Sequence, residues 1–230
     1  MCIRDSKYII AGASCHRTKE TVALAHAAGE AGADFVLVLP PYYLPTSRQG
    51  IIDYYREIAA NTKAGVIIYH YPSNVNVYLE PEFIMELSSI ENMVGIKNTV
   101  DMHHTVNLIA LNKHNPKFRI CNGFEHLILS NLASGGDACM GIVQNLAPRQ
   151  LSELYAAMQR GDYAAASKIQ DSLVPLYNLL ETAEDPCPAP VKYGLEMQGF
   201  HCGLPRRPLV PLSEGTKVRL KQVMEQIGLI

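Results

Sequence analysis

Residues 93–98 read Met93-Val94-Gly95-Ile96-Lys97-Asn98, a short apolar run that ends in a lysine and an asparagine. Short runs of this kind, bounded by Gly, Pro, Ser or Asn, are typical of strands that are buried on both faces. The same pattern recurs along the chain and predicts strands that begin near residues 8, 35, 65, 93, 118 and 138.

The predicted strands alternate with predicted helices. Their starts lie about 20 to 30 residues apart, which is the length of one strand, one helix and two short loops. Helical spacing of apolar residues covers residues 18–31, which Gly32 closes, residues 47–61, and residues 80–89, which have Pro81 in the first turn. A repeated βα unit is predicted, and with it an α/β fold with a parallel sheet.

Two architectures fit a series of βα units: a doubly wound sheet, or part of an eight-stranded (β/α)8 TIM barrel. A doubly wound nucleotide-binding fold commonly carries G-x-G-x-x-G or G-x-x-x-x-G-K-[ST] after the first strand. Neither phrase is present there. Its absence favours the barrel.

Helical patterns alone follow the last predicted strand, with a Pro-rich break at residues 186–190. We therefore expect a partial barrel over residues 7–160 and a C-terminal helical extension over residues 161–230. The expected helices after the barrel strands are residues 148–159, 162–180, 191–197 and 215–227.

The composition is typical of a globular protein that acts on a small molecule. Of the 230 residues, 48% are hydrophobic, and the net charge is -2 with the 20 lysines and arginines spread along the chain. We therefore expect no nucleic-acid or membrane partner. A membrane-spanning run and a secretory pattern are both missing, so a cytoplasmic location is expected. Scattered cysteines without a C-x-x-C pair favour free thiols.

Lys97 is the first candidate for chemistry. A lysine that closes an apolar strand is unusual, because lysine is seldom buried without a partner or a function. In a barrel this position faces the active-site mouth. Removal from water there would favour the neutral amine, which is the form that attacks a ketone to give an imine. The alternative is a lysine whose charged end reaches solvent at the end of the strand.

Tyr69 takes the same place one βα unit earlier, directly after Val66, Ile67 and Ile68. We expect it to open onto the same mouth as Lys97, where a phenol can relay protons during imine formation. The alternative is a tyrosine that packs its ring and leaves its hydroxyl in water. Residues 40–43, Pro40-Pro41-Tyr42-Tyr43, leave the preceding strand and are interpreted as rigid packing or interface residues.

The histidines raise the alternative of a metal-dependent aldolase. Their spacing does not favour it. His103 and His104 are adjacent and so diverge on a helix, while His16, His70 and His126 form no H-x-x-x-H or H-x-H pair. We interpret them as surface or core histidines, and expect neither a metal site nor a cofactor.

Five stretches in order along the chain carry a family resemblance: residues 40–46, 69–73, 94–99, 141–148 and 207–213. They are similar to the phrases PYY-x-x-P-[ST], Y-N-x-P and GIK-[DE]-[STA], to the last barrel strand, and to RLPLVPLS. From Lys7 to roughly Leu220 the chain resembles the dihydrodipicolinate synthase and N-acetylneuraminate lyase family of class I pyruvate-dependent aldolases.

The resemblance implies a (β/α)8 barrel with a C-terminal helical bundle, usually assembled as a homotetramer. It implies that Lys97 forms a Schiff base with pyruvate or another 2-oxo acid, and that Tyr69 is the proton relay. Tyr43 is implied as the tyrosine that neighbouring subunits lend to each other. The further substrate contacts implied are Gly123 and Glu125 for a polyol chain, and Met140, whose backbone carbonyl approaches the imine.

Two of the positions that differ from the family bear on the substrate and the site. Asn74 stands where dihydrodipicolinate synthases carry an arginine that binds a carboxylate, and a neutral amide cannot replace a bidentate guanidinium. This favours an acidic-sugar or hydroxy-oxo-acid substrate over aspartate semialdehyde, with Asn74 and Glu125 as hydrogen-bonding groups. His70 stands in place of the asparagine of Y-N-x-P.

The sequence therefore predicts a Schiff-base-forming lyase or aldolase acting on 2-oxo acids, either dihydrodipicolinate-synthase-like or sugar-acid-lyase-like. The alternative is a catalytically impaired barrel fragment or a non-catalytic small-molecule binder. Six βα units are counted where a barrel has eight, and the strand at residues 8–13 resembles the family's third. We thus expect an N-terminally truncated barrel with little activity alone, preceded by an artefact of cloning or gene prediction at residues 1–6.

Overall fold

The computed structural model describes residues 7–181 and 185–230, which form two compact units. The first unit runs to Phe124 and includes Ser130–Met140, and the second contains Glu125–Leu129 and Gly141–Ile230. Residues 1–6, which we interpreted as an artefact, lie outside the described residues. Each unit is described below by itself.

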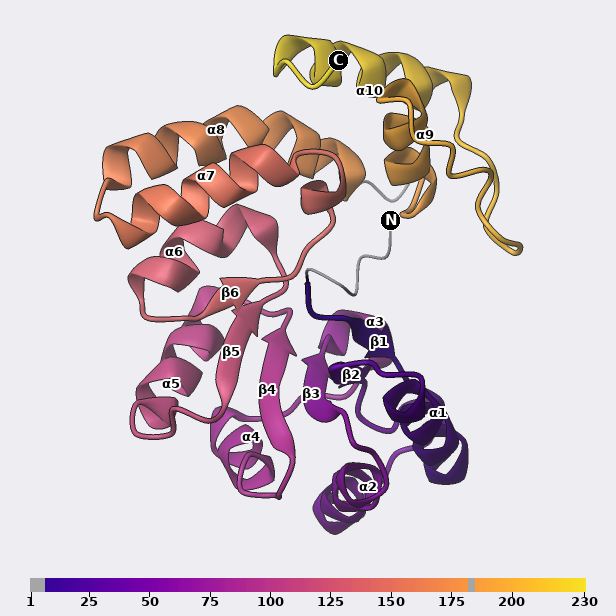
Figure 1. Ribbon diagram of the computed structural model, residues 1–230, viewed down its shortest axis with the longest axis vertical. Helices are drawn as coiled ribbons and strands as arrows, with labels where there is room; N and C mark the ends of the chain where they lie inside the picture. Colours follow the sequence, from indigo (N-terminus) through magenta and orange to yellow (C-terminus); the bar gives the residue numbers. More distant parts are fainter. Residues whose placement is uncertain (1–6, 182–184) are drawn as a thin grey trace. The chain divides into compact units, whose positions relative to one another are not determined.

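A parallel sheet of six strands forms the centre of the first unit (Figure 1), and each strand pairs with the next one along the chain. A doubly wound sheet reverses its strand order at a switch point, whereas barrel strands follow one another in sequence. The observed order β1-β2-β3-β4-β5-β6 is the order of a half-barrel. The strands are β1 Ile10–Gly12, β2 Phe35–Val38, β3 Gly65–His70, β4 Met93–Asn98, β5 Arg119–Asn122 and β6 Ala138–Cys139.

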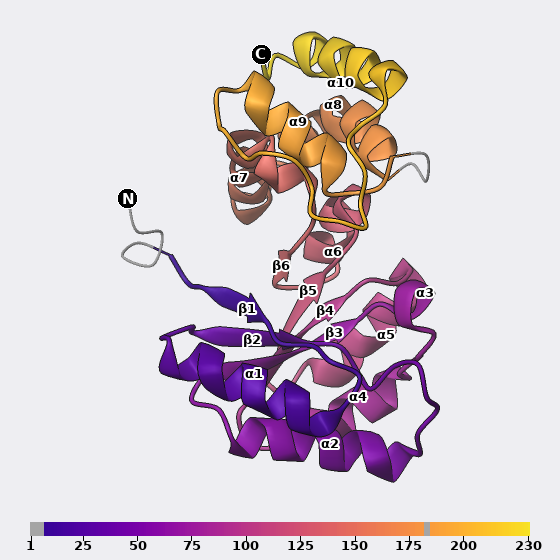
Figure 2. The same ribbon diagram turned by 90° about the vertical axis from the view of Figure 1, so that its right-hand side faces the viewer.

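Helices of the first unit pack on one face of this sheet (Figure 2). Ile68, Ile96 and Ile120 on neighbouring strands are buried in a single core, together with Ile58 and Leu108 from the helices. Ser47 and Asp101 cap α2 and α5 by accepting backbone hydrogen bonds, as their residue types predict. The helices are α1 Thr18–Glu30, α2 Arg48–Ala60, α3 Pro72–Val75, α4 Pro81–Leu87 and α5 Met102–Asn112, followed by α6 Ile128–Ala133 where the two units meet in the sequence.

The second unit is helical apart from its connections, and its helices begin and end within two residues of the predicted bounds. The Pro-rich break is shorter than expected, because α9 already begins at Ala189 with Pro190 in its first turn, where a missing N–H costs nothing. The elements are η2 Glu125–Leu127, η3 Val143–Asn145, α7 Pro148–Gln159, α8 Tyr163–Leu180, α9 Ala189–Met197 and α10 Glu214–Gln226. A domain boundary at residue 160 stays a prediction; in the described chain α7 packs against α8 within this unit.

The sixth strand is shorter than its apolar sequence predicts. Only Ala138 and Cys139 pair with β5, whereas the apolar run that predicts this strand extends over residues 138–143. The backbone N–H groups of Ile142, Val143 and Gln144 all donate to one carboxylate instead, that of Glu125. Amides that converge on one side chain cannot form a strand ladder, so the expected extension is wrong.

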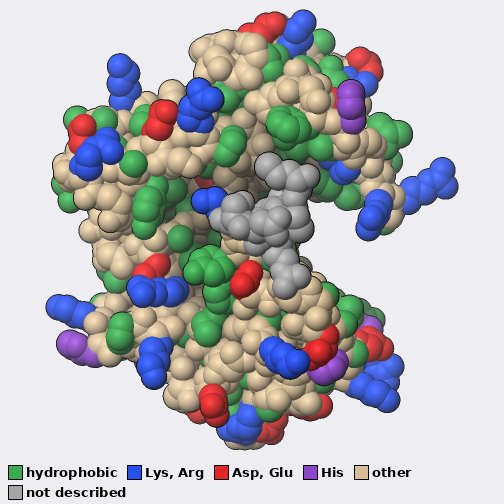
Figure 3. Space-filling view, viewed as in Figure 1, with side chains coloured by type: hydrophobic (Ala, Val, Ile, Leu, Met, Phe, Trp, Pro, Cys, Tyr) green, Lys and Arg blue, Asp and Glu red, His purple; other side chains and the backbone are tan. Residues whose placement is uncertain are grey.

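The surface is mixed in charge on the face drawn in Figure 3, where basic and acidic side chains are interspersed. Within residues 7–181 and 185–230, no helix combines the length and the apolar character needed to cross a membrane. The cysteines in these ranges are free thiols, as the scattered spacing predicts, and Cys2 lies outside them.

Candidate active site

Lys97 and Tyr69 meet at the carboxyl ends of two neighbouring strands. They are paired in the register of β3 and β4, and the Lys97 Nζ donates a hydrogen bond of 3.2 Å to the Tyr69 hydroxyl oxygen. The same nitrogen lies 4.3 Å from the centroid of the Tyr69 ring, within the range of a cation–π contact. The predicted meeting of these two side chains at one strand edge is confirmed.

A β-bulge sets this pairing. Val66 pairs with Met93, but the next residue, Ile67, pairs with Gly95, so that Val94 has no partner across the ladder. Side chains alternate between the two faces of a strand, and a slip of one residue exchanges the faces. Without the bulge Lys97 would pair with His70 and point to the face opposite Tyr69.

Gly95, next to the bulge, allows β4 to approach β5 closely. A Cβ built on this residue would lie 2.6 Å from the backbone oxygen of Arg119 on β5, a distance that real Cβ atoms do not show. Backbone cannot yield as a flexible side chain can. Glycine is therefore required two residues before the lysine because a side chain would collide with the backbone of β5, and not because of the backbone conformation of Gly95.

Cys121 is a second nucleophile type in the same row of side chains, since it pairs with Lys97 across β4 and β5. Burial raises the pKa of the Cys121 thiol to about 12, and the carboxylate of Asp137 adds to this effect. Burial also raises the pKa of the Tyr69 phenol. Both groups therefore keep their protons at neutral pH, which leaves Lys97 as the candidate nucleophile and Tyr69 as a proton donor.

Two further aromatic rings, which the sequence did not lead us to expect, form a row with Tyr69: Tyr71 contacts Tyr69, and Phe124 contacts Tyr71. The Tyr71 ring stacks on the Tyr69 ring with 5.8 Å between centroids, and the Phe124 ring meets Tyr71 edge-on at 6.4 Å. Tyr71 follows β3 and Phe124 follows β5, the strands on either side of β4. The signal that could have found both of them is an aromatic residue one or two positions after a strand whose end carries a candidate site residue.

The other predicted substrate residues of the first unit lie in the segments that follow the strands. Gly123 donates its N–H to the Asn98 backbone oxygen at 3.0 Å, and Met140 donates its N–H to the Asn122 backbone oxygen at 2.9 Å. Asn74 is exposed in the short helix α3. Tyr43 is 86% exposed, with a positive φ of 77° in the segment after β2. The substrate roles of these residues stay predictions.

Glu125, in the second unit, is buried, and its carboxylate is occupied by backbone groups. One oxygen accepts the N–H groups of Ile142 and Val143 at 2.6 and 2.8 Å, and the other accepts that of Gln144 at 3.0 Å. Burial raises the pKa of Glu125, and these three bonds oppose the rise. A contact from Glu125 to a polyol substrate stays a prediction, and the bonds observed hold the segment that follows the last strand.

The histidines divide as surface and core residues. His70 and His104 are buried, whereas His103 and His126 are exposed. Among residues 7–181 and 185–230, no group of three histidine, cysteine, aspartate or glutamate side chains is placed to hold a metal ion.

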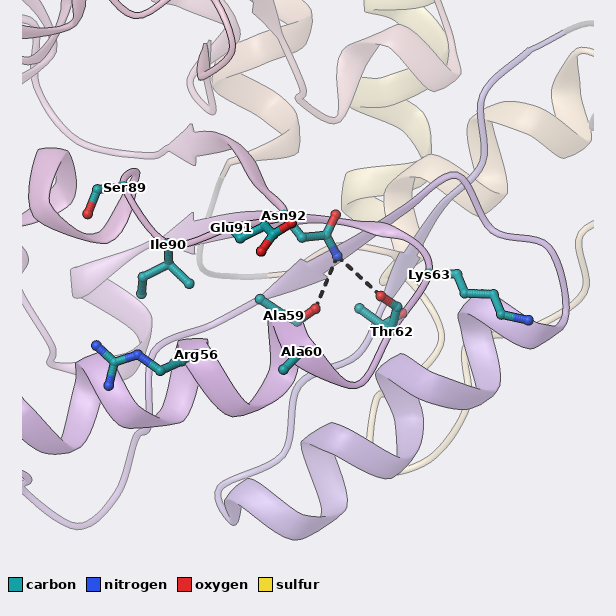
Figure 4. Close-up of a pocket in the computed structure, with 9 residues that line it drawn as sticks. All are labelled: Arg56, Ala59, Ala60, Thr62, Lys63, Ser89, Ile90, Glu91 and Asn92. Carbon is teal, nitrogen blue, oxygen red and sulfur yellow. Dashed lines mark hydrogen bonds between the residues drawn. The ribbon is translucent and has the colours of Figure 1, made fainter.

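A separate hollow of about 910 Å³ lies at the opposite ends of the strands (Figure 4). Asn92, directly before β4, has a positive φ of 68°, and its amide donates to the backbone oxygens of Ala59, Thr62 and Ala64. TIM-barrel active sites lie at the carboxyl ends of the strands. The hollow lies at the amino ends of β3 and β4, so we assign it a structural role, with Asn92 closing the loop after α2.

A lysine at the carboxyl end of a barrel-type strand, with a phenol beside its amine, is the arrangement expected of the class of TIM-barrel, class I aldolase-type proteins. The family model described as the dihydrodipicolinate synthetase family matches residues 2–227. The chain belongs to this family.

Known relatives and structures agree with this assignment. A 4-hydroxy-tetrahydrodipicolinate synthase of Bradyrhizobium diazoefficiens is 33% identical over 236 residues, which cover 100% of this chain and 77% of the relative. The crystal structure of dihydrodipicolinate synthase from Thermotoga maritima aligns with a TM-score of 0.93 at 30% identity, over 99% of this chain and 78% of that one. A chloride-inhibited dihydrodipicolinate synthase from Acinetobacter baumannii, complexed with pyruvate, aligns with a TM-score of 0.91 at 29% identity, over 99% and 77% of the two chains.

Proposed function

We propose that this chain carries a Schiff-base lyase or aldolase site in which Lys97 forms an imine with pyruvate or a related 2-oxo acid. The observation that carries the proposal is the 3.2 Å bond between the Lys97 Nζ and the Tyr69 hydroxyl at the carboxyl ends of β3 and β4. The pyruvate complex of the Acinetobacter baumannii relative supports the choice of oxo acid.

In the proposed chemistry, the neutral Lys97 amine attacks the ketone carbon and gives a carbinolamine. As the carbinolamine forms, the phenol of Tyr69 passes a proton to the ketone oxygen and takes one from the attacking nitrogen. It then protonates the departing hydroxyl, which leaves as water, and the imine nitrogen keeps its remaining proton and is cationic. The Tyr69 phenolate is reprotonated from solvent. In cleavage, the bond between the carbon next to the imine carbon and the hydroxyl-bearing carbon breaks: the hydroxyl loses its proton, its carbon leaves as an aldehyde, and the electron pair gives an enamine that is then protonated. In condensation, the carbon next to the imine carbon first loses a proton to give the same enamine, which attacks the aldehyde. Hydrolysis releases the oxo acid and the free lysine. The raised pKa of Tyr69 keeps its proton available at neutral pH.

The remaining predicted residues are proposed as substrate and assembly contacts. Gly123 and Met140 lie in the segments after β5 and β6, where backbone groups can face the bound oxo acid. Tyr43, exposed and conformationally unusual, is proposed to complete the site of a neighbouring copy in a homo-oligomer, a tetramer in this proposal. A tyrosine lent between subunits requires an exposed position in the isolated chain.

The acceptor or leaving aldehyde is proposed to be a sugar-acid or hydroxy-oxo-acid fragment. The support is Asn74, an exposed amide where a carboxylate-binding arginine would favour aspartate semialdehyde. A panel that measures pyruvate release from sugar acids and condensation with aspartate semialdehyde separates the two. If condensation with aspartate semialdehyde is faster than cleavage of any sugar acid, the semialdehyde is the better substrate and this proposal is wrong.

Borohydride trapping tests the imine itself. The protein is incubated with pyruvate and sodium borohydride, digested, and searched by mass spectrometry for the reduced pyruvate adduct. We expect the adduct on Lys97 and on no other lysine. Lys63, an exposed lysine paired with Glu30, is the internal control for non-specific reductive alkylation.

The trapping experiment also addresses the alternative, a non-catalytic binder. Binding of pyruvate by calorimetry without an adduct on Lys97 would favour a binder. An adduct without turnover on any substrate of the panel would indicate an impaired enzyme that still forms the imine. A folded protein with neither binding nor adduct would contradict the proposal.

A further inference from the structure

A ring of buried polar groups lies on the face of β3 and β4 opposite Lys97 and Tyr69. Its members are His70, directly after Tyr69, Asn98, directly after Lys97, His104 of α5 and the backbone of Leu79. All four residues are at most 2% exposed. Because side chains alternate along a strand, His70 and Asn98 point to the opposite face of the sheet from Tyr69 and Lys97, and contact α5 and Leu79 there.

The hydrogen bonds of the ring fix one proton arrangement. The Leu79 N–H donates to Nε2 of His70 at 3.1 Å, so the proton of His70 is on Nδ1, which donates to Oδ1 of Asn98 at 2.8 Å. The Asn98 amide nitrogen donates to Nδ1 of His104 at 3.1 Å, and Nε2–H of His104 donates to the Leu79 oxygen at 2.9 Å. Every donor in the ring has an acceptor, and the two imidazoles are opposite tautomers.

Two further contacts tie the ring to its surroundings. The Asn98 amide nitrogen also donates to the Thr105 hydroxyl at 3.1 Å, and that hydroxyl donates to the Asp101 backbone oxygen at 2.9 Å. The Tyr78 ring meets both imidazoles edge-on, at 5.5 and 5.4 Å between centroids. Burial is the main cause that lowers the pKa of His70, to about 4, with a smaller contribution from His104, so His70 is neutral at neutral pH.

We propose that His70, Asn98 and His104 are positioning residues, which hold the ends of β3 and β4 in the register that keeps the Lys97 amine against the Tyr69 hydroxyl. The proposal rests on the imine function proposed above. It assigns a task to the two histidines that does not involve a metal.

Geometry makes positioning the expected task of this ring. Each of two strands contributes one ring member and, as the adjacent residue, one member of the reacting pair. A shift of either strand end by a fraction of an ångström would lengthen the 3.2 Å bond of the pair. Misplacement of a reacting group by about 1 Å can cost about 10²-fold in rate. A closed, fully bonded network resists such a shift better than apolar packing, because its bonds are directional.

A matched pair of asparagine variants tests the proposal on the intact chain. Asn98→Ala removes the amide of the ring, and Asn92→Ala removes an amide at the other end of β4, where it bonds only to backbone oxygens. The positive φ of Asn92 makes its alanine variant strained as well. Asn92→Ala is therefore a demanding control for general destabilisation. Both are assayed well below their unfolding temperatures.

Two readouts are compared. At saturating pyruvate, the rate of borohydride-trappable adduct formation on Lys97 should fall about tenfold or more in Asn98→Ala and stay within about twofold in Asn92→Ala. Trinitrobenzenesulfonate labelling of Lys97 relative to Lys63 needs no substrate, and should rise about fivefold in Asn98→Ala as the amine leaves Tyr69. Slower trapping with faster labelling is a pattern that loss of folded protein does not produce.

Variants of His104 separate the two halves of the ring and guard against an Asn98→Ala protein that does not fold. In His104→Asn the side-chain oxygen takes the place of Nδ1 and keeps the bond from Asn98. In His104→Gln the amide nitrogen takes the place of Nε2 and keeps the bond to Leu79. We expect His104→Asn to retain more of the trapping rate and of the wild-type labelling ratio than His104→Gln.

Equal effects of Asn98→Ala and Asn92→Ala on both readouts, or the reverse ranking of the His104 variants, would overturn the positioning role. If the wild-type protein gives no adduct, the imine function fails instead, and the labelling ratios alone decide whether the ring positions Lys97. Labelling of Lys97 unchanged within about twofold in every folded ring variant would then refute it.

Discussion

β4 has an asparagine at each end, and the two are held by different kinds of partner. Asn92, before the strand, donates to three backbone oxygens, whereas Asn98, at its end, bonds to the side chains of His70, His104 and Thr105. Backbone oxygens are present in any sequence that adopts the fold. Side-chain partners must be supplied by particular residues. The amino end of the sheet is thus specified by the fold, and the carboxyl end by the residues beside the amine.

The largest expected effect on activity comes from substitution of Lys97, at the carboxyl end of β4. Lys97→Met keeps the length and apolar stem of the side chain but removes the amine, so imine formation is lost. We expect the pyruvate adduct to disappear and turnover to fall by at least about 10³-fold, with the unfolding midpoint changed little. Intact-mass analysis after borohydride and a thermal melt measure both. An undiminished adduct in Lys97→Met would place the nucleophile elsewhere.

Tyr69→Phe is expected to have the next largest effect on imine formation. The ring that contacts Lys97 and stacks on Tyr71 is kept, and only the hydroxyl is removed. Loss of a positioned proton relay costs about 10²–10⁴-fold in rate. The trapping rate at saturating pyruvate should fall by that order, while the pyruvate concentration at half saturation changes less. Tyr8→Phe, which removes the hydroxyl of an exposed tyrosine in the same unit, is the control and should trap at the wild-type rate.

The ring should also give the carboxyl end a pH dependence. His70 has a pKa of about 4 when folded, against roughly 6.5 in an unfolded chain, so the unfolded state binds more protons between these values. The contribution of neutral His70 to the free energy of unfolding is therefore fully present above about pH 6.5. It decreases as the pH falls towards 4, by up to about 3 kcal/mol. The residues that face His70 include the titratable His104 and Tyr78.

Urea unfolding of the wild type and His70→Asn at pH 7 and pH 5 measures this effect. The variant should lose less stability between the two pH values, because asparagine does not titrate. Equal losses would show that other groups, such as carboxylates, account for the acid sensitivity.

The smallest expected effect on function is at the amino end. Asn92→Ala removes three hydrogen bonds and strains a left-handed backbone, and should lower the free energy of unfolding by about 1–3 kcal/mol. Its trapping rate should remain that of the wild type at temperatures where both are folded. Denaturant titration and trapping at two temperatures test this. A rate that falls with the stability would show that the two ends of β4 are coupled.

The sequence predicted the fold and the central pair because both follow from local patterns. Apolar runs interrupted every 20 to 30 residues gave the six strands, and a polar residue at the end of a run gave Tyr69 and Lys97. Parallel strands bring such residues to one edge without any knowledge of long-range packing. The departures from local pattern could not be predicted in this way.

Three such departures depended on contacts between distant residues. The bulge at Val94 is decided by how β3 and β4 fit together, and nothing in an apolar run marks it. His104 is 34 residues from His70, so no spacing rule joins them, and their pairing requires Asn98 between them. The end of β6 is decided by Glu125, whose carboxylate draws three amides out of the strand path.

The closed ring has a consequence for how this sequence can change. Substitution of one member leaves a neighbour with an unpaired donor or acceptor in a buried place, so single replacements are selected against even where the exchanged residues are similar. Substitutions are tolerated only when partners change together, so the effect of a substitution at position 70, 98 or 104 depends on the residues at the other two. The chain already differs from the phrases Y-N-x-P and GIK-[DE]-[STA] at both His70 and Asn98. Among relatives, these three positions should covary while Tyr69 and Lys97, their immediate neighbours in the chain, stay fixed.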